Sequence, residues 1–300
     1  MKKFILSMLL SVLALGLISP KVYTDQTEVI FSTIPPIKYL IDRITENTSL
    51  SSESIIERGQ DPHNFELKPS LIKKLEKAKL YFAVGMGGTE EILLEKIKTT
   101  YPNLKIVNIS EGIEKIKTYA HHKHNHDSDH DSDKENLIPS YDPHIWNSPK
   151  NMKKIAKNIY NTIKAIYPQY EKTFESNYRR LISDLDNLDK EVSKILSPYK
   201  GKKFLVYHSA FKYFEKDYGV KEISIEYEGK EATPKMIQEI LEIAKKENIK
   251  IIFVQIGFST KSANIIAESV KAKVEEINPI DYDYINNIRN FAKKIAESYK

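Results

Sequence analysis

The stretch QYEKTFESNYRRLISDLDNLDKEVSKILS, residues 169–197, decides the fold of this chain. Its apolar residues recur at alternating spacings of four and three, which puts them on one face of a helix with a period of roughly 3.5 residues. They are Phe174, Tyr178, Leu181, Leu185, Leu188, Val192 and Ile195. Pro168 precedes the stretch and Pro198 follows it, with no Gly or Pro in between. The pattern predicts one helix of about 28 residues, roughly 42 Å long at 1.5 Å per residue.

We interpret this helix, over 168–198, as a rigid connection between two halves of the chain. A coiled-coil arm is the alternative, but it needs about three to four or more heptads, and the charges here serve equally well as a solvated face. On each side of the helix the chain alternates strand and helix patterns, and the candidate metal ligands are divided between the two sides. Two such halves on a stiff helix would form a cleft.

The N-terminal half, residues 25–167, alternates β-rich runs with helical patterns. The β-rich runs are 28–34, 52–57, 80–88 and 105–110. A helical pattern follows each of the first three, and a further helix runs from Pro149 to Tyr167. This alternation predicts a parallel sheet covered by helices. Ligands of such sheets lie beyond the carboxyl ends of the strands, and His63 follows the second strand.

The C-terminal half, residues 199–300, repeats this alternation. Its predicted strands are 204–207, 222–227, 250–257 and 273–277. The first is followed by His208 and a helix that we expect Ser209 to cap, and a last helix starts at Asp281 or Asp283. We therefore expect an α/β fold of two lobes, each with a parallel four-stranded sheet flanked by helices, joined by one long rigid helix.

Composition restricts the classes of function and the cellular location. The 300 residues are 41% apolar, as in a globular protein, and carry a net charge of +5. Lys and Arg are dispersed among Asp and Glu, so a nucleic-acid partner is not expected. Cys is absent, which excludes disulfides and a lipid-bearing cysteine within this sequence.

The N-terminus, MKKFILSMLLSVLALGLISP, has the layout of a secretory signal peptide, which we place at residues 1–24. An uncleaved anchor is the alternative, but about 15 apolar residues fall short of the ~20 that a spanning helix needs. The cleavage site is open, since no A-x-A-like site stands out near 18–26. We expect an exported protein without a lipid anchor, retained in a periplasm.

Three histidines outside low-complexity sequence are candidate metal ligands. Asp61-Pro62-His63 is echoed by Asp142-Pro143-His144, and proline fixes the backbone before each imidazole. His208 lies at the carboxyl end of a predicted strand. Trp146, the only Trp, is expected to pack beside His144 and hold it still.

The segment HHKHNHDSDHDSD, residues 121–133, holds five histidines and four aspartates. It has too few apolar groups to join the core, so we expect a disordered loop. Neutral imidazoles suit Zn, Cu and Ni, but ordering the segment costs about 1–2 kcal/mol per residue of backbone entropy. We interpret it as an accessory chelator of several weakly held ions.

Three neutral imidazoles from well-separated loops, with a possible carboxylate, match tetrahedral Zn²⁺ held by N and O ligands at about 2.0–2.2 Å. The carboxylate would come from the start of the last helix, where an Asp serves equally as an N-cap. The sequence thus predicts a zinc site that draws its ligands from both sides of the long helix.

Four motifs resemble those of the solute-binding proteins of zinc and manganese ABC importers, of the zinc-uptake type. They are DPHNFELKPS, DPHIW, YHSAFKYFEKDYGV and VQIGFSTKSANIIAES. The similarity covers essentially the whole mature chain in order, including the His-rich insertion and the long helix. It implies two α/β lobes, with a metal ion held between them and handed to a membrane permease.

By motif, the resemblance implies that His63, His144 and His208 are metal ligands. The last-helix motif of the family places an Asp at the fourth position, here Asp283, with Asp281 or water as alternatives. A histidine at 208 and the His-rich segment favour zinc, because manganese-type relatives tend to use a second carboxylate.

The function expected from these residues is capture and delivery of a metal ion by a monomer, not catalysis. A zinc hydrolase is a rival, but no HExxH-type Glu accompanies any of the histidines. A His-rich metal buffer is the second rival, in which 121–133 would be the main binding segment.

Overall fold

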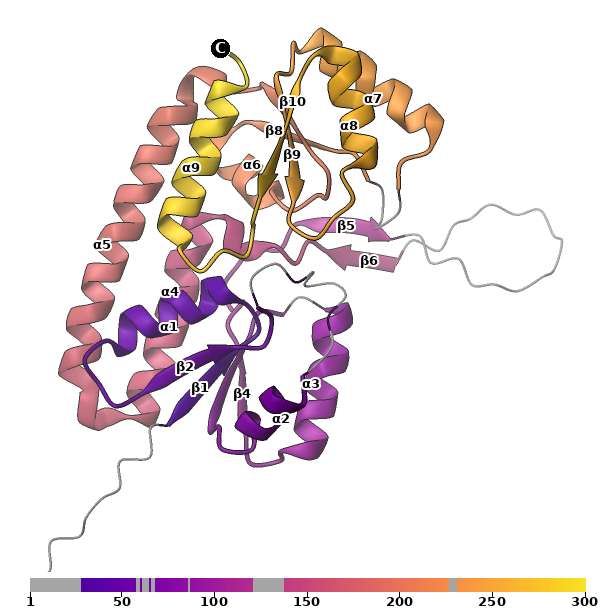
Figure 1. The fold of residues 1–300 in the computed structure, drawn as a ribbon. Coiled ribbons are helices and arrows are strands. Elements are labelled where there is room, and N and C mark those ends of the chain that lie inside the picture. Colours follow the sequence, from indigo (N-terminus) through magenta and orange to yellow (C-terminus); the bar gives the residue numbers. More distant parts are fainter. Residues whose placement is uncertain are drawn as a thin grey trace, which may run out of the picture.

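The computed structural model describes residues 28–57, 60, 65, 68–85, 87–120, 138–226 and 231–300. Two parallel sheets lie at opposite ends of one long helix, α5 (Glu171–Leu196), which runs along one side of the molecule (Figure 1). The predicted signal peptide and the His-rich segment 121–133 lie outside the described residues.

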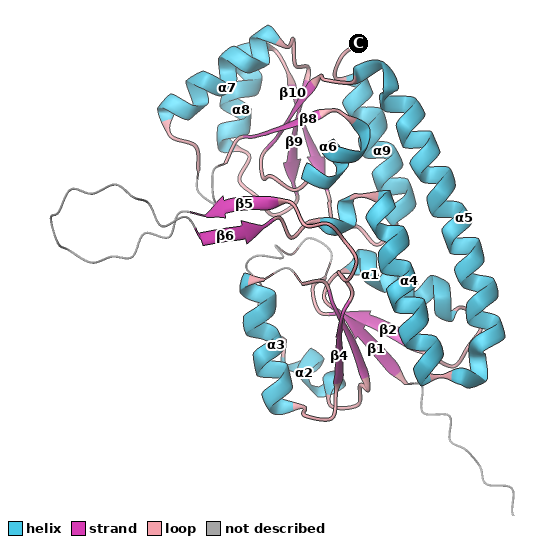
Figure 2. Ribbon diagram, turned by 180° about the vertical axis from the view of Figure 1, so that it is seen from behind, coloured by secondary structure: helices cyan, strands magenta, loops and turns pink. Residues whose placement is uncertain are grey.

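The N-terminal sheet has four parallel strands in the order β2-β1-β3-β4. Its strands are β1 (Val29–Ser32), β2 (Ser51–Ser54), β3 (Leu80–Ala83) and β4 (Lys105–Asn108). Its helices are α1 (Pro35–Thr45), α2 (Pro69–Leu75), α3 (Gly88–Thr100) and α4 (Pro149–Ile166). Helices α1 and α4 cover one side of the sheet, and α2 and α3 the other (Figure 2).

The C-terminal sheet is also four-stranded and parallel, in the order β10-β9-β7-β8. Its strands are β7 (Lys203–Val206), β8 (Lys221–Ser224), β9 (Ile251–Gln255) and β10 (Lys273–Ile277). Its helices are α6 (Lys212–Tyr218), α7 (Pro234–Lys246), α8 (Lys261–Val270) and α9 (Tyr284–Glu297). The two sheets confirm the predicted α/β fold.

Successive residues of β7 and β9 point to opposite faces of the C-terminal sheet, and these faces belong to different buried clusters. Leu205 and Ile252 pack in a small cluster with residues of α7 and α8. Phe204 and Phe253 belong to a much larger cluster, which continues through α5 and α9 into the N-terminal lobe. The two lobes therefore share one core.

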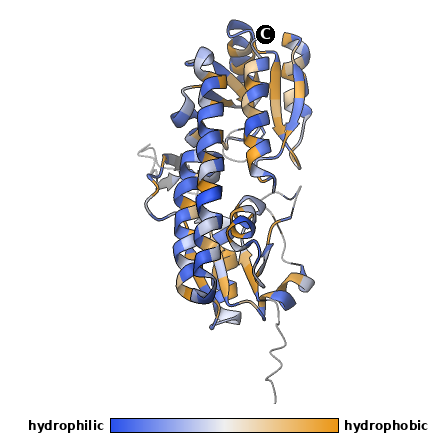
Figure 3. Ribbon diagram, turned by 90° about the vertical axis from the view of Figure 1, so that its left-hand side faces the viewer, coloured by the Kyte–Doolittle hydropathy of each residue, from blue (hydrophilic) through white to orange (hydrophobic). Residues whose placement is uncertain are grey.

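The predicted long helix is confirmed, with 26 residues between two short 3₁₀ turns (Pro168–Tyr170 and Ser197–Tyr199). The apolar face is buried as expected, except that Tyr178 and Ile195 are only half-buried. Helix α5 contacts α1, α4 and α9, so it packs along both lobes rather than projecting as an arm. Its outer surface is mostly hydrophilic (Figure 3). Among the described residues, no helix combines the length and the apolar character needed to cross a membrane.

An antiparallel hairpin that we did not predict lies between the two sheets (Figures 1 and 2). Its strands are β5 (Lys117–Ala120) and β6 (Ile138–Tyr141), paired from Lys117 with Tyr141 to Ala120 with Ile138. The hairpin flanks the His-rich segment. These four-residue strands are too short to show a clear period-2 pattern. Pro139 also disfavours a strand prediction, because proline cannot donate a backbone hydrogen bond.

The expectation that Ser209 caps the helix after β7 was wrong. Helix α6 begins at Lys212 after Phe211, without a side-chain cap. The Ser209 hydroxyl donates instead to Glu222 Oε2 at 3.1 Å. Residues 208–211 therefore form a turn held from the neighbouring strand β8, and this turn carries His208.

Candidate metal site

His144 is buried in the turn that follows β6, with 4% of its surface exposed. Asp142 Oδ1 accepts the backbone N–H of His144 at 2.8 Å and lies 3.0 Å from its Nδ1. Burial lowers the pKa of His144. Burial also opposes ionisation of Asp142, yet the adjacent imidazole and N–H hold the pKa of that carboxyl below its usual value. With a proton on Nδ1 shared with Asp142, Nε2 of the neutral ring would be the nitrogen that can bind a metal ion.

His208 is held by the two strands that neighbour β7. Its Nδ1 is hydrogen-bonded to Glu226 Oε1, just beyond β8. Gln255, the last residue of β9, holds the His208 backbone twice: Oε1 accepts the N–H at 3.0 Å, and Nε2 donates to the C=O at 2.5 Å. Ring and backbone are therefore both fixed, and the carboxylate on Nδ1 again directs Nε2 toward a metal ion.

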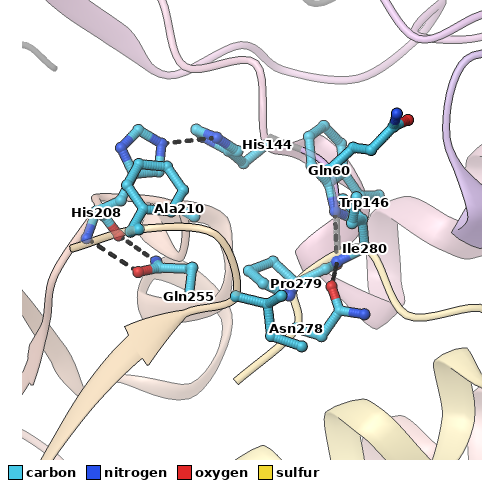
Figure 4. Close-up of a pocket in the computed structure, with 11 residues that line it drawn as sticks. Gln60, His144, Trp146, His208, Ala210, Gln255, Asn278, Pro279 and Ile280 are labelled. Atoms are coloured by element: carbon cyan, nitrogen blue, oxygen red, sulfur yellow. Dashed lines mark hydrogen bonds between the residues drawn. The ribbon is translucent and has the colours of Figure 1, made fainter. Parts of the chain in front are cut away.

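The two imidazoles face each other through their Nε2 atoms, 3.4 Å apart, with ring centroids 5.2 Å apart (Figure 4). Two Zn–N bonds of about 2.0–2.1 Å at the tetrahedral angle place the nitrogens roughly 3.3–3.4 Å apart. The observed separation matches that value. Each ring also has a carboxylate on Nδ1, the arrangement that orients histidine ligands of zinc.

Aromatic side chains enclose the pair in a small pocket (Figure 4). Trp146 packs edge-on against His144 at 5.2 Å between centroids, and Phe258 stacks on His208 at 5.1 Å. Gln60 of the N-terminal half and Asn278 of the C-terminal half both line the pocket. Its volume of about 20 Å³ is enough for roughly one water molecule, and so for a single metal ion.

The segment that carries His144 is fastened to the C-terminal lobe. Trp146 Nε1 donates to the C=O of Pro279 at 3.0 Å, and Asn147 Nδ2 donates to the C=O of Ala210 at 2.9 Å. Tyr213 of α6 donates its hydroxyl to the C=O of Asp142 at 2.9 Å. The expectation that Trp146 packs beside His144 is confirmed. Three hydrogen bonds tie the segment that carries His144 to the lobe that carries His208.

Among the described residues, the structure brings no other predicted ligand together with these two histidines. His63 lies outside the described residues. Asp283 caps α9, as the cap alternative predicted, and accepts from the backbone N–H and from Nδ2 of Asn286. Asp281 accepts from the Asp283 N–H at 3.0 Å. The described part of the chain holds no group of three or more His, Cys, Asp or Glu able to bind a metal ion. The full ligand set and its fourth member stay predictions.

The side chains that hydrogen-bond the two histidines were not predicted from the sequence. Asp142 was noted only as part of a repeated DPH motif, although an Asp two residues before a histidine is well placed to bond its N–H and ring. Glu226 and Gln255 follow or end strands adjacent to β7. The rule that ligand sites form at the carboxyl ends of parallel strands would have singled them out once the strand order was known.

Glu222 on β8 allows a prediction about pH and stability. Burial raises the pKa of Glu222 from 4.5 to about 7. Between these values the folded protein keeps a proton that the unfolded chain releases, so this group lowers the free energy of unfolding as pH rises from 4.5 to 7. We expect Glu222→Gln to flatten this decline in urea unfolding of the metal-free protein. An unchanged pH profile would contradict the assignment.

Comparison with known proteins agrees with this geometry. The model of the family of zinc-uptake complex component A, periplasmic (ZnuA), matches residues 30–298. A crystal structure of ZnuA superposes with a TM-score of 0.81 at 29% identity, covering 91% of this chain and 100% of that chain. A ZnuA deletion mutant with zinc bound gives a TM-score of 0.80 at 29% identity, covering 91% and 98%.

The zinc-binding lipoprotein AdcA of Streptococcus pneumoniae is 28% identical over 260 residues. This alignment covers 84% of the chain and 50% of AdcA, so the chain spans half the length of that relative. Two α/β lobes on one long helix, with paired imidazoles in a pocket lined from both halves, define a metal-binding solute-binding protein of the ABC-importer type. The chain belongs to the ZnuA family, which is described as zinc-uptake complex component A, periplasmic.

Proposed function

We propose that this protein binds one Zn²⁺ ion between its lobes and delivers it to the permease of an ABC importer. The observation that carries the proposal is the pair of Nε2 atoms 3.4 Å apart, each on a ring whose Nδ1 meets a carboxylate. The zinc-bound ZnuA structure and the name of AdcA support the choice of metal. The protein would act as a monomer and catalyse no reaction.

The proposed ligands are His63, His144 and His208, with Asp283 at the fourth position and Asp281 or water as alternatives. Neutral imidazoles suit Zn²⁺, whereas Mn²⁺ prefers carboxylate, carbonyl and water oxygens. His144 and His208 therefore favour zinc over manganese. The His-rich segment 121–133 would serve as an accessory chelator.

We place this capture in the periplasm, after export by the signal peptide and without a lipid anchor. The family to which the chain belongs is periplasmic, while the AdcA relative is a lipoprotein. Membrane fractionation of a Gram-negative host, before and after osmotic shock, tests the location. Release by shock supports it, and retention in the membrane pellet contradicts it.

Calorimetric titration of the metal-stripped mature protein lacking residues 121–133 tests the function. We expect one tight site for Zn²⁺ and much weaker binding of Mn²⁺. The full-length protein, titrated in parallel, should add only weaker sites. Absence of a tight site from the shortened protein would overturn the proposal and favour the His-rich segment as the main binder. A tighter site for Mn²⁺ than for Zn²⁺ would favour a manganese-type protein.

Removing the carboxylate behind His208 should weaken zinc binding without removing a ligand. In Glu226→Ala the ring loses the acceptor that orients it, and loss of such a partner costs roughly 10–100-fold in metal affinity. Competition against a chromophoric zinc chelator measures the change. Glu276→Gln, an exposed site on β10, is the control and should bind as the wild type does. Equal affinity of Glu226→Ala and wild type would mean that Glu226 does not orient the ligand.

A further inference from the structure

The turn after β7 is held by one carboxylate that the ligand set does not use. Glu222 Oε1 accepts the backbone N–H groups of Ala210 at 2.8 Å and of Phe211 at 3.1 Å. Its Oε2 accepts the hydroxyl of Ser209 at 3.1 Å. Three donors from the consecutive residues 209–211 converge on one side chain. The position of residues 209–211 therefore depends on Glu222.

The same turn connects the two imidazoles. Its first residue is His208, and the C=O of its Ala210 accepts from Asn147 Nδ2 at 2.9 Å. Asn147 lies three residues after His144 in the same short segment. The Ala210 residue is thus held from both sides, by Glu222 at its N–H and by Asn147 at its C=O. A continuous path of hydrogen bonds and backbone runs from Glu222 to both histidine segments.

We infer that Glu222 is a positioning residue of the metal site, which sets the separation of the two Nε2 atoms by fixing the 209–211 turn. The inference rests on the proposed function. Binding sites need their ligands held within about 0.5 Å of the productive geometry. Loss of the carboxylate would remove the three hydrogen bonds that hold residues 209–211, while the bonds of His208 to Gln255 and Glu226 would remain. Glu222 is not among the proposed ligands and would act through the backbone of residues 209–211.

The test compares Glu222→Ala with Glu215→Ala in the protein lacking residues 121–133. Glu215 is the matched control, because its Oε2 accepts the backbone N–H of Glu222 at 3.0 Å. Glu215 bonds residues 209–211 through its backbone N–H, which donates to the C=O of Phe211 at 2.8 Å and is kept in alanine. Zn²⁺ affinity is measured by chelator competition, and Co²⁺ serves as a spectroscopic probe of coordination geometry. We expect Glu222→Ala to bind Zn²⁺ roughly 10–100-fold more weakly, with an altered Co²⁺ spectrum. Glu215→Ala should match the wild type in both measurements.

Glu222→Gln provides the rescue, because its amide oxygen can still accept both backbone N–H groups, and we expect near wild-type affinity. Wild-type affinity and an unchanged Co²⁺ spectrum in Glu222→Ala would overturn the inference, even if thermal stability fell. If Glu222→Ala does not fold, Asn147→Leu takes its place, because it removes the hydrogen bond to the C=O of Ala210. Unchanged Zn²⁺ affinity of Asn147→Leu would then overturn the inference. Failure of the wild type to bind Zn²⁺ would overturn the proposed function separately.

Discussion

Replacing His208 by alanine is expected to weaken zinc binding at least about 100-fold. Loss of a group that only orients a histidine ligand already costs roughly 10–100-fold, so loss of the ligand itself should cost more. Gln255 is engaged with the His208 backbone and Phe258 is apolar, so neither of these neighbours offers a metal ion a replacement for the imidazole. The Nε2 of His144 would then lose the proposed second ligand, whose Nε2 lies 3.4 Å away.

Chelator competition in the protein lacking residues 121–133 measures this loss without binding by the His-rich segment. In the full-length protein, His124→Ala is the matched control, because it also removes one imidazole but lies in the His-rich segment. It should leave the tight site unchanged. Tight zinc binding by His208→Ala would exclude His208 as a ligand and remove the main support for the two-imidazole site.

Replacing Trp146 by alanine is expected to cost about 3–5 kcal/mol of unfolding free energy, the range for large aromatic residues in a core. The side chain is 0% exposed, and its Nε1 donates to Pro279 across the interface between the lobes. Its loss leaves a cavity and an unsatisfied carbonyl oxygen, and removes the ring that packs against His144. Zinc affinity should therefore fall together with stability.

Urea unfolding followed by far-UV circular dichroism measures the change, because this variant has no tryptophan fluorescence. Trp146→Phe keeps most of the packing and should cost clearly less. Tyr141→Ala is the control for removal of an exposed aromatic, since Tyr141 is 47% exposed, and it should change stability little. A loss below about 1 kcal/mol in Trp146→Ala would show that the interface repacks without the indole.

Most of the fold could be predicted, because its signals are local. The apolar period of 169–197 needs no tertiary information, and each buried strand is a short apolar run followed by a helical pattern. The hairpin of β5 and β6 could not be predicted in this way, since its pairing is tertiary and its strands are short. The bond of Ser209 to Glu222 joins residues 13 positions apart, whereas a capping rule considers only the next three.

The candidate site was predicted by residue type and strand position, and its supporting groups were not. His63 and His208 were proposed from their positions after predicted strands, and His144 from the repeated Asp-Pro-His motif. The structure brings His144 and His208 together. Glu226 and Gln255 act on His208 only because β8 and β9 flank β7, an order that no local pattern reveals. His63 and the fourth ligand remain predictions, since their convergence with the two imidazoles depends on how the lobes meet.

The core shared through α5 has a consequence for how the molecule melts. Proteins built from separate domains often unfold in several transitions, but here one contiguous cluster of buried residues runs from the N-terminal sheet through α5 and α9 to the C-terminal sheet. The calorimetric and van't Hoff enthalpies of the metal-free protein should therefore nearly agree, as for one cooperative unit. Helices α7 and α8, whose buried residues form their own small cluster, are the part expected to exchange amide hydrogens first.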